Sequence, residues 1–324
     1  MTGLTVAVTG PTGDLGRAFV RALERAPEVE RIVGMARRPF DAQAHGWTRT
    51  EYRRGDVLDR ASVERLLEGA DVVVHLAFIV VKAGDETRHI NVEGSRNVFE
   101  AAAAAGARRL VYASSVAAYG FPEADGLLTE DLPALGYARH PYSAHKAEVE
   151  GELAVALEGS ETDAWVLRPC IVAGPDAPTL IEQARWPDRL PGPLAALAGS
   201  VGVLPDPGVP FQLVHHDDVA CALCAGVVGR GEPGAYNLAA DGEVTMRDLA
   251  QAMGYRTVPM PRVAVDVAAE VVARLSFMPE EATWVEALRK PVLMDTSKAR
   301  RLLRWHPRHD ARETLDLTVS ARSR

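Results

Sequence analysis

The sequence predicts an α/β fold with a doubly wound parallel sheet, and three observations lead to this class. Short apolar runs rich in β-branched residues alternate with helical patterns through the first half of the chain. The runs are almost continuously apolar, as in Asp71–Leu76, which is typical of strands that helices cover on both faces. The chain of 324 residues is also long enough to bury a full core and carry a smaller second lobe.

The expected elements follow one another in a regular order. The expected strands are Thr5–Thr9, Arg31–Met35, Asp71–Leu76, Arg109–Ala113, Ala164–Arg168 and Phe211–Val214. The expected helices are Leu15–Ala26, Arg88–Ala105, Tyr142–Leu157 and one that begins at Asp217. Because parallel strands need crossover connections, this alternation favours one sheet with helices on both faces.

The pattern changes after Gly174-Pro175. Proline and glycine become dense up to Pro210, around the apolar insert Leu190–Leu204, and residues 244–290 look helical and apolar. We therefore expect a main domain of residues 1–174 plus 211–239. A smaller, mainly helical lobe is expected to comprise residues 175–210 plus 240–324.

Composition excludes several classes of partner. The net charge is −8 and the basic residues are dispersed, whereas a nucleic-acid-binding surface needs clustered positive charge. No run approaches the roughly 18 apolar residues of a membrane-spanning helix. The amino terminus runs directly into a strand pattern, which leaves no room for a signal peptide. We predict a cytoplasmic protein with a small-molecule substrate and no nucleic-acid or membrane partner.

No metal site is expected. Cys221 and Cys224 have metal-like spacing, but no second pair completes a zinc site, and their apolar surroundings predict buried helical thiols. His215 and His216 are expected to cap or pack near Asp217-Asp218, without a third ligand. His145 is expected to be a solvent-facing helix residue.

A glycine-rich turn separates the first expected strand from the first helix. Glycines in such a turn allow a sharp bend, close approach to a pyrophosphate and tight packing of the helix on the strand. The unpaired N–H groups of the helix N-terminus then point at the phosphates. The expected contacts are Gly10, Thr12, Gly13, Asp14, Leu15 and Gly16. The main domain is thus predicted to be a Rossmann-like dinucleotide-binding domain, and the smaller lobe to bind the substrate.

The spacing Gly-x-x-Gly-x-x-Gly and a series of later motifs resemble the extended short-chain dehydrogenase/reductase superfamily. The pattern is most similar to its NAD(P)-dependent epimerase/dehydratase members, including a branch that resembles UDP-glucose 4-epimerase. The motifs are Gly55-Asp56-Val57, His75-Leu76-Ala77, Asn91 to Asn97, Leu167-Arg168-Pro169, Gly174-Pro175, His215 to Ala220, Tyr236-Asn237-Leu238 and Ala299 to Pro307. The resemblance implies further cofactor contacts at Asp56, Val57, Leu76, Ala77 and Pro169.

Tyr142 and Lys146 form the expected catalytic pair. They stand four residues apart, on one face of a helix. A free tyrosine has a pKa of ~10. A nearby ammonium and the positive nicotinamide ring are expected to lower it, so that Tyr142 exchanges a proton with a substrate hydroxyl. The resemblance implies that both residues contact the cofactor and that Lys146 bonds the nicotinamide ribose.

Ser115 lies in the register of the family's catalytic serine, and its hydroxyl is expected to stabilise charge on the substrate oxygen. Ser114 is the alternative. Asn91 is expected to complete a proton relay through water, with helix capping or packing as the alternative.

The end of the second expected strand favours NADP. A carboxylate usually bonds the ribose of NAD there, but this chain has Ala36 followed by Arg37 and Arg38. Guanidinium groups suit the 2′-phosphate of NADP. NAD stays an alternative, because Asp56 and backbone contacts can suffice.

Three functions follow from these patterns. The first is a reductase or dehydrogenase acting on an alcohol or carbonyl of a small, apolar substrate, because Leu190–Val201 is apolar. The second is a nucleotide-sugar 4-epimerase with tightly bound NAD. Against it, Phe211 stands where relatives carry an arginine, although Arg185 and Arg189 can serve a phosphate. The third is a non-catalytic NADP sensor. The resemblance also implies a homodimer, paired through the helices at Arg88–Ala105 and Tyr142–Leu157.

Overall fold

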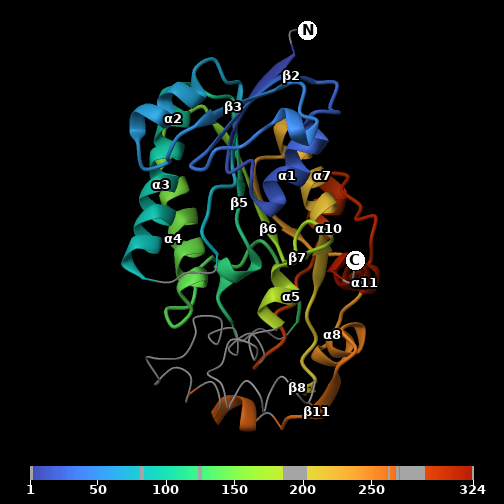
Figure 1. Cartoon of the computed structure of the whole chain (residues 1–324). Helices are drawn as coiled ribbons and strands as arrows, with labels where there is room; N and C mark the ends of the chain where they lie inside the picture. Colours follow the sequence, from blue (N-terminus) through green and yellow to red (C-terminus); the bar gives the residue numbers. More distant parts are fainter. Residues whose placement is uncertain are drawn as a thin grey trace.

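Seven parallel strands form the central sheet of the computed structural model, in the order β10-β6-β5-β4-β1-β2-β3 (Figure 1). Their bounds are β1 Leu4–Thr9, β2 Val29–Ala36, β3 Thr50–Arg54, β4 Val72–His75, β5 Arg109–Ala113, β6 Asp163–Pro169 and β10 Gly234–Leu238. The structure describes residues 3–80, 84–122, 126–184, 203–261, 263–267, 270 and 289–322. The predicted doubly wound parallel sheet is confirmed.

Helices cover both faces of this sheet, as the apolar strands predicted. The helices are α1 Asp14–Leu23, α2 Arg60–Leu67, α3 Asp85–Ala104, α4 Pro141–Ala156 and α7 His216–Val227. On strand β1, Val6 and Val8 pack into the cluster that includes α1 and α7, whereas Ala7 packs with α2, α3 and α4. Successive side chains of a strand point to opposite faces, so each strand joins two separate cores.

Strand β3 and helix α2 are absent from the elements that the sequence predicted. Strand β3 has the sequence Thr-Glu-Tyr-Arg-Arg, and none of its side chains is fully buried. It lies at the edge of the sheet, where charged residues are common because one side faces solvent. Its pattern is therefore not the apolar run that identified the central strands.

The remaining elements lie outside the seven-stranded sheet. They are η1 Gln43–His45, η2 Val116–Tyr119, β7 Ile171–Ala173, α5 Thr179–Ala184, β8 Val203–Asp206, β9 Leu213–His215, α8 Met246–Ala252, β11 Arg256–Pro259, α10 Ser297–Leu302 and α11 Ala311–Arg322. Strand β9 pairs with β7 outside the main sheet, while β10 returns to it. The segment Leu190–Val201, Arg185, Arg189 and Ala282–Leu288 lie outside the described residues.

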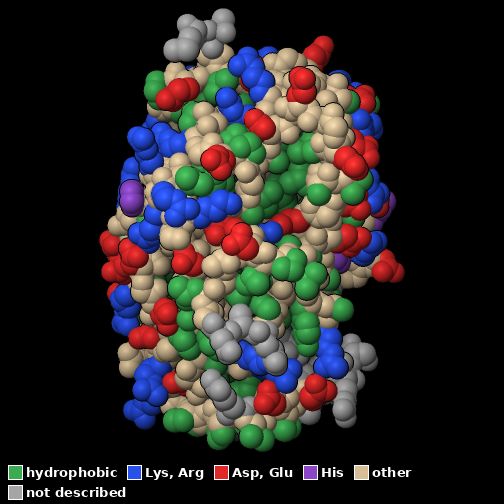
Figure 2. Space-filling model, turned by 180° about the vertical axis from the view of Figure 1, so that it is seen from behind, with side chains coloured by type: hydrophobic (Ala, Val, Ile, Leu, Met, Phe, Trp, Pro, Cys, Tyr) green, Lys and Arg blue, Asp and Glu red, His purple; other side chains and the backbone are tan. Residues whose placement is uncertain are grey.

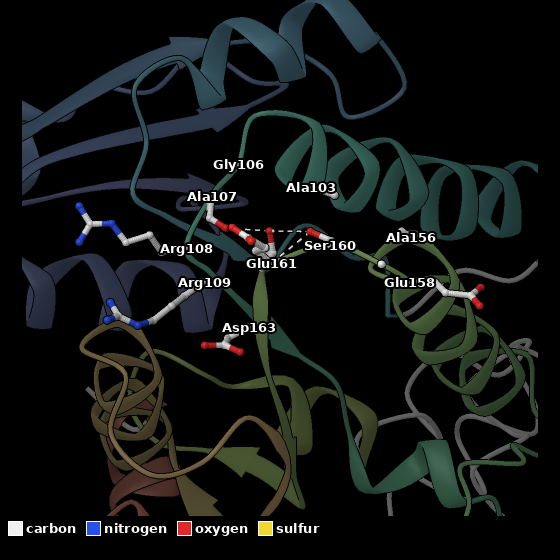
Figure 3. Close-up of a pocket in the computed structure, with 12 residues that line it drawn as sticks. Ala103, Gly106, Ala107, Arg108, Arg109, Ala156, Glu158, Ser160, Glu161 and Asp163 are labelled. Carbon is white, nitrogen blue, oxygen red and sulfur yellow. Dashed lines mark hydrogen bonds between the residues drawn. The ribbon is translucent and has the colours of Figure 1, made fainter.

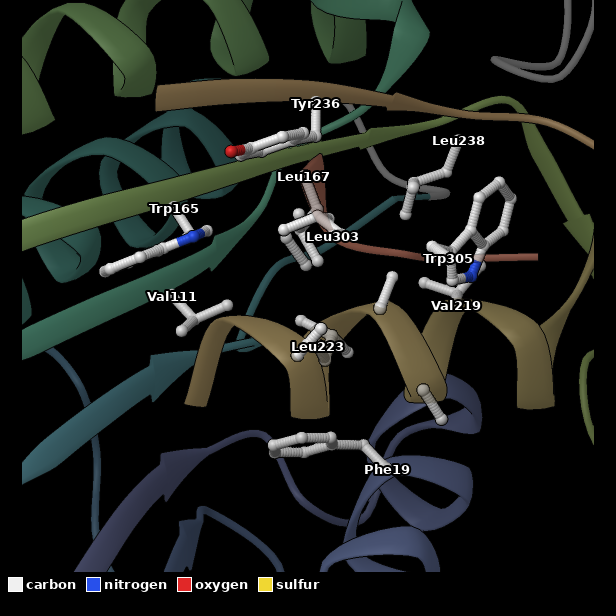
Figure 4. Packing of buried hydrophobic residues seen from close by; sticks show 14 of the residues in the cluster. Phe19, Val111, Trp165, Leu167, Val219, Leu223, Tyr236, Leu238, Leu303 and Trp305 are labelled. Atoms are coloured by element: carbon white, nitrogen blue, oxygen red, sulfur yellow. The ribbon is translucent and has the colours of Figure 1, made fainter. Parts of the chain in front are cut away.

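The end of the chain packs back onto the main domain. Leu303 and Trp305 join the same buried cluster as Val219 and Leu238 (Figure 4). The Trp305 indole N–H also donates to the carbonyl of Asp218 at 2.8 Å. The two domain limits drawn from the sequence stay a prediction. Leu303 and Trp305 nevertheless share a core with residues that the sequence assigned to the main domain.

The surface agrees with the dispersed charge of the sequence. Acidic and basic side chains are intermixed over the face shown in Figure 2. In the described parts of the chain, no helix combines the length and the apolar character that crossing a bilayer requires.

We expect Gly16→Ala to lower the free energy of unfolding by about 1–3 kcal/mol, as overpacking does. A Cβ atom at Gly16 would lie 2.2 Å from the carbonyl oxygen of Gly10, so α1 would have to move away from the turn. The control is Gly151→Ala on α4, where nothing lies within 4 Å and the same change should stabilise the protein by about 0.5–1 kcal/mol. Urea denaturation measures both. Equal effects would show that the close contact at Gly16 carries no cost.

Candidate active site

The glycine-rich turn lies where the carboxyl ends of β1 and β4 meet. Gly10 has a φ of +72°, and a Cβ atom there would lie 2.7 Å from the backbone nitrogen of Ala77. Backbones therefore approach more closely here than any side chain would allow. Thr12, Gly13, Asp14 and Leu15 lie on the outer, partly exposed side of the same turn.

The turn leaves the start of α1 open. Gly13 caps this helix without a side-chain hydrogen bond, so the first N–H groups keep their donor capacity. Arg17 reaches back to the carbonyl of Thr12 at 3.4 Å and to the carboxylate of Asp14 at 3.2 Å. The arrangement suits an anionic group such as a phosphate.

Arg37 and Arg38 follow β2 beside this turn. The strand end is tied to the turn by the hydrogen bond from the Gly10 N–H to the carbonyl of Met35, at 2.9 Å. Both arginine side chains are exposed, and neither forms an ion pair within the described ranges. Their backbone is held from β3, because Arg54 Nε donates to the carbonyl of Arg37 at 3.1 Å. Their charges are thus available to a ligand.

The two segments expected to lie along the cofactor are also held near the turn. Asp56 accepts from the N–H of Leu58 at 3.0 Å, and Val57 packs so closely on α3 that a Cβ at Gly94 would lie 2.5 Å from it. Leu76 donates its N–H to the carbonyl of Thr9 at 3.1 Å and leads into Ala77. Pro169 ends β6 and is buried beside β10.

Ser115 and Tyr142 come together from separate elements. Ser115 follows β5 and starts the short helix η2, where its hydroxyl accepts from the N–H of Ala117 at 3.2 Å. Tyr142 stands at the start of α4, and the Ser115 side chain lies near enough to its phenol to lower the pKa of Tyr142. Two neighbouring hydroxyl groups can share a substrate oxygen.

Lys146 lies one turn further along α4 and is 3% exposed. Its ammonium donates to the carbonyl of Ala113 at 2.7 Å and to the hydroxyl of Tyr112 at 3.2 Å. Burial lowers the pKa of Lys146 to about 7, against an opposing effect of Glu150. A lysine in this state changes its charge near neutral pH.

The electrostatics of Tyr142 differ from the expectation. Burial raises the pKa of Tyr142, and the Ser115 side chain opposes that rise. The Lys146 nitrogen lies 5.9 Å from the centre of the Tyr142 ring, and its own pKa is lowered by burial. In the protein alone, burial therefore outweighs the expected effect of the ammonium, and Tyr142 is a neutral phenol at neutral pH. The effect of a bound nicotinamide ring stays a prediction.

Phe78 is a site residue that the sequence analysis missed. The Lys146 ammonium lies 3.7 Å from the centre of the Phe78 ring, a cation–π contact. The same ring meets the Tyr142 ring edge to face, with 5.7 Å between centres. Two more rings extend this aromatic group. The His140 ring lies 6.3 Å from the Tyr142 ring, and the Phe121 ring lies 5.9 Å from the His140 ring, measured between ring centres. The signal was available, because Phe78 directly follows the recognised segment that ends at Ala77.

Asn91 uses its side chain to hold the segment after β4. Its amide accepts from the N–H of Ile79 at 2.8 Å and donates to the carbonyl of Ile79 at 3.0 Å. These contacts match the packing alternative, and the water relay stays a prediction. A buried chain of hydrogen bonds ends at the Asn91 carbonyl: Thr9 to His75 at 2.7 Å, His75 to Ser95 at 2.9 Å, and Ser95 to Asn91 at 2.5 Å.

His145 does not face solvent as expected. It is 7% exposed, and burial lowers its pKa. Ser114 is engaged elsewhere, since its hydroxyl donates to the carboxylate of Glu150 at 2.5 Å. Glu150 in turn pairs with Arg168, and both residues were overlooked as site residues because nothing in the local pattern joins them.

A cluster of histidines stands at the start of α7. His215 caps the helix, as predicted, by accepting from the N–H of Asp217 at 3.2 Å. His215, His216 and Asp217 have possible ligand atoms within 4.8 Å of one another. Backbone N–H groups already bond to one ring nitrogen of each histidine, and Arg21 lies 3.7 Å from Asp217. The absence of a metal stays a prediction.

A hollow of about 630 Å³ lies at the amino ends of β5 and β6, between the loops that follow α3 and α4 (Figure 3). Arg108, Arg109 and Glu161 line it, and Thr162 donates to the carbonyl of Ala107 at 2.7 Å in its wall. Ligands of doubly wound sheets bind at the carboxyl ends of the strands, so this hollow is not the candidate active site.

Comparison with curated proteins finds relatives of several kinds. An uncharacterized protein of Mycobacterium tuberculosis is 29% identical over 99% of this chain, which spans only 30% of that protein's length. Human 3 beta-hydroxysteroid dehydrogenase type 7 is 36% identical over 45% of this chain and 43% of its own. The 2-alkyl-3-oxoalkanoate reductase of Shewanella oneidensis is 30% identical over 56% of this chain and 48% of its own.

Solved structures share the fold over the whole chain. The Bordetella bronchiseptica enzyme WbmH in complex with NAD+ has a TM-score of 0.73 at 20% identity, covering 99% of both chains. UDP-glucuronic acid 4-epimerase from Bacillus cereus in complex with NAD has a TM-score of 0.71 at 19% identity, covering 98% of both. The model of the NAD dependent epimerase/dehydratase family matches residues 6–239. The chain therefore belongs to the NAD-dependent epimerase/dehydratase family.

Proposed function

We propose that this protein is an NAD(P)-dependent oxidoreductase acting at an alcohol or carbonyl carbon of a small apolar substrate. The observation that carries the proposal is the placement of Tyr142 at the start of α4, next to Ser115 at the end of β5 and to the buried Lys146. A sensor of the dinucleotide has no use for these three groups, so their meeting favours an enzyme.

The residues at the turn fit a dinucleotide. The space around Gly10 and Gly16 excludes a Cβ atom, and the uncapped start of α1 offers N–H donors to a pyrophosphate. Arg37 and Arg38 are placed to meet a 2′-phosphate, which favours NADP over NAD. When bound, the nicotinamide ring supplies or accepts the hydride.

The chain's own groups then handle the substrate oxygen. Ser115 donates a hydrogen bond to it and stabilises negative charge that develops there. Tyr142 holds a proton, since burial raises its pKa, and so serves best as the acid that protonates the oxygen of a carbonyl being reduced. Lys146 fixes the end of β5 and is assigned to the nicotinamide ribose.

An apolar substrate is supported by the surroundings of Tyr142. Phe78 and the aromatic group that includes His140 border its ring, and Val80, 38% exposed, follows in the same segment. Phe211 pairs with Val244 through two backbone hydrogen bonds of 2.8 and 2.9 Å and puts an apolar side chain where an arginine would suit a diphosphate. Two curated relatives are named for a hydroxysteroid and an alkyl oxoalkanoate.

A nucleotide-sugar 4-epimerase is the second candidate, because the structures that share the fold include a UDP-glucuronic acid 4-epimerase in complex with NAD. Extraction of the purified protein separates the two. Stoichiometric bound NAD would favour the epimerase, and an empty site that binds NADPH would favour the reductase.

We expect Tyr142→Phe to retain cofactor binding but to lose at least ~100-fold in turnover, a typical general-acid contribution. The assay follows oxidation of NADPH with a panel of apolar ketones and oxoacyl compounds, with UDP-glucose as the epimerase arm. Tyr137→Phe is the matched control, because Tyr137 packs on Phe121 in the same loop region. Unchanged turnover of Tyr142→Phe on a confirmed substrate would remove Tyr142 from the mechanism.

NADP should bind at least about 10-fold more tightly than NAD, because one charge-assisted phosphate contact contributes ~1.5–3 kcal/mol. Replacing Arg37 and Arg38 together by Ala should erase the preference, and Ala36→Asp should turn it toward NAD. The preference should weaken with salt, since both arginines are exposed. Titration calorimetry with both oxidised cofactors measures it.

The charge-matched control replaces Arg31 and Arg65, two exposed arginines that pair with Glu51 and Asp59. This variant should keep the preference of the parent. Equal affinities of the parent for both cofactors would show that Arg37 and Arg38 only face solvent.

A homodimer through α3 and α4 stays a prediction. The two helices are joined by ion pairs, among them Arg96 with Glu152 at 2.7 Å, and Val155 of α4 is 70% exposed. Light scattering at micromolar concentration should give the mass of a dimer. A monomeric mass would contradict the pairing.

A further inference from the structure

A buried ion pair joins helix α4 to strand β6 next to the catalytic loop. Two hydrogen bonds, of 3.0 and 2.6 Å, connect the guanidinium of Arg168 to the carboxylate of Glu150. The side chains are 7% and 11% exposed. Because charges withdrawn from water must compensate one another, the pair holds α4 and β6 in one relative position.

Glu150 also accepts the hydroxyl of Ser114 at 2.5 Å. The backbone N–H of Ser114 donates to the carbonyl of Leu167 at 2.8 Å, so this residue is fixed at both its side chain and its main chain. Ser115 is the next residue. The same carboxylate therefore fixes the peptide from which the Ser115 hydroxyl projects.

Glu150 stands one helical turn after Lys146 on α4. The other titratable groups that face Lys146 are His75 from β4, Tyr112 from β5 and Tyr142 from α4. Burial lowers the pKa of Lys146, and the Glu150 carboxylate raises it. Of these neighbours, Glu150 is the one that carries negative charge.

We propose that Glu150 is a positioning residue of the active site, which fixes the Ser114–Ser115 peptide and places a carboxylate one helical turn from Lys146. The inference rests on the proposed function for its effect on turnover. Its effect on Lys146 does not, because the charge state of this lysine can be measured without a substrate.

The first measurement is an NMR titration of protein labelled with ¹³C at the lysine Cε atoms. The chain contains four lysines, at positions 82, 146, 290 and 298, so the Lys146 signal can be assigned with Lys146→Arg. In Glu150→Gln the titration midpoint of Lys146 should fall by about one unit, since an opposing charge is lost. Glu150→Asp, which keeps the charge, should return the midpoint toward that of the parent.

Glu152→Gln is the matched control. Glu152 lies two residues further along α4 and pairs with Arg96 at the surface. This variant should leave the Lys146 midpoint and turnover as in the parent. Ser114→Ala should leave the midpoint unchanged and lower kcat, which separates the two tasks of Glu150.

The second measurement compares kcat with KM on the substrate found for the parent. Misplacing Ser115 in Glu150→Gln should lower kcat about 10-fold or more with little change in KM. If the single variant does not fold, because Arg168 loses its partner, Glu150→Gln with Arg168→Gln removes both charges and is titrated in its place.

An unchanged Lys146 midpoint in folded Glu150→Gln would overturn the inference, whatever the enzyme turns over. A parent protein that turns over no compound of the panel would contradict the proposed function instead. The titration distinguishes the two failures.

Discussion

The architecture of this protein depends on the close approach of three backbone segments at the glycine-rich turn. Helix α1 begins there against the carbonyl of Gly10, and Gly10 itself lies against the segment that leaves β4. Any side chain at Gly10 or Gly16 would force these segments apart. Since β1 lies between β2 and β4 in the sheet, the turn sets where the carboxyl end of β4 lies relative to the start of α1.

Helix α4 positions the groups to which we assign the chemistry, at the carboxyl ends of the same strands. It brings Tyr142 and Lys146 to the end of β5, where Ser115 lies two residues after Ala113, the last paired residue of the strand. Lys146 is held by the Ala113 carbonyl and by the Phe78 ring, two contacts with different chemistry. The carbonyl dipole and the π face of the ring thus replace water around the buried ammonium group.

Much of this arrangement could be predicted from sequence because it depends on local pattern. Apolar periodicity identified the central strands, and the spacing of glycines identified the turn. Edge strand β3 was not predicted, because most of its residues are charged and none is fully buried. His145 was misjudged because a helical position does not say which neighbours cover it. Glu150 and Arg168 meet only when α4 packs on β6, so no short stretch of sequence contains their pairing.

The hydrogen bonds around His75 determine which of its ring nitrogens carries the proton. Ser95 donates to the Asn91 carbonyl, so it accepts from His75 Nε2, and Thr9 must donate to Nδ1. The imidazole is thereby restricted to one tautomer, and burial lowers its pKa to about 3. Burial therefore keeps this ring uncharged at neutral pH. The hydrogen-bonded core between β1, β4 and α3 therefore gains no charge at mildly acidic pH. Of His75 and Lys146, only Lys146 changes its charge near neutral pH.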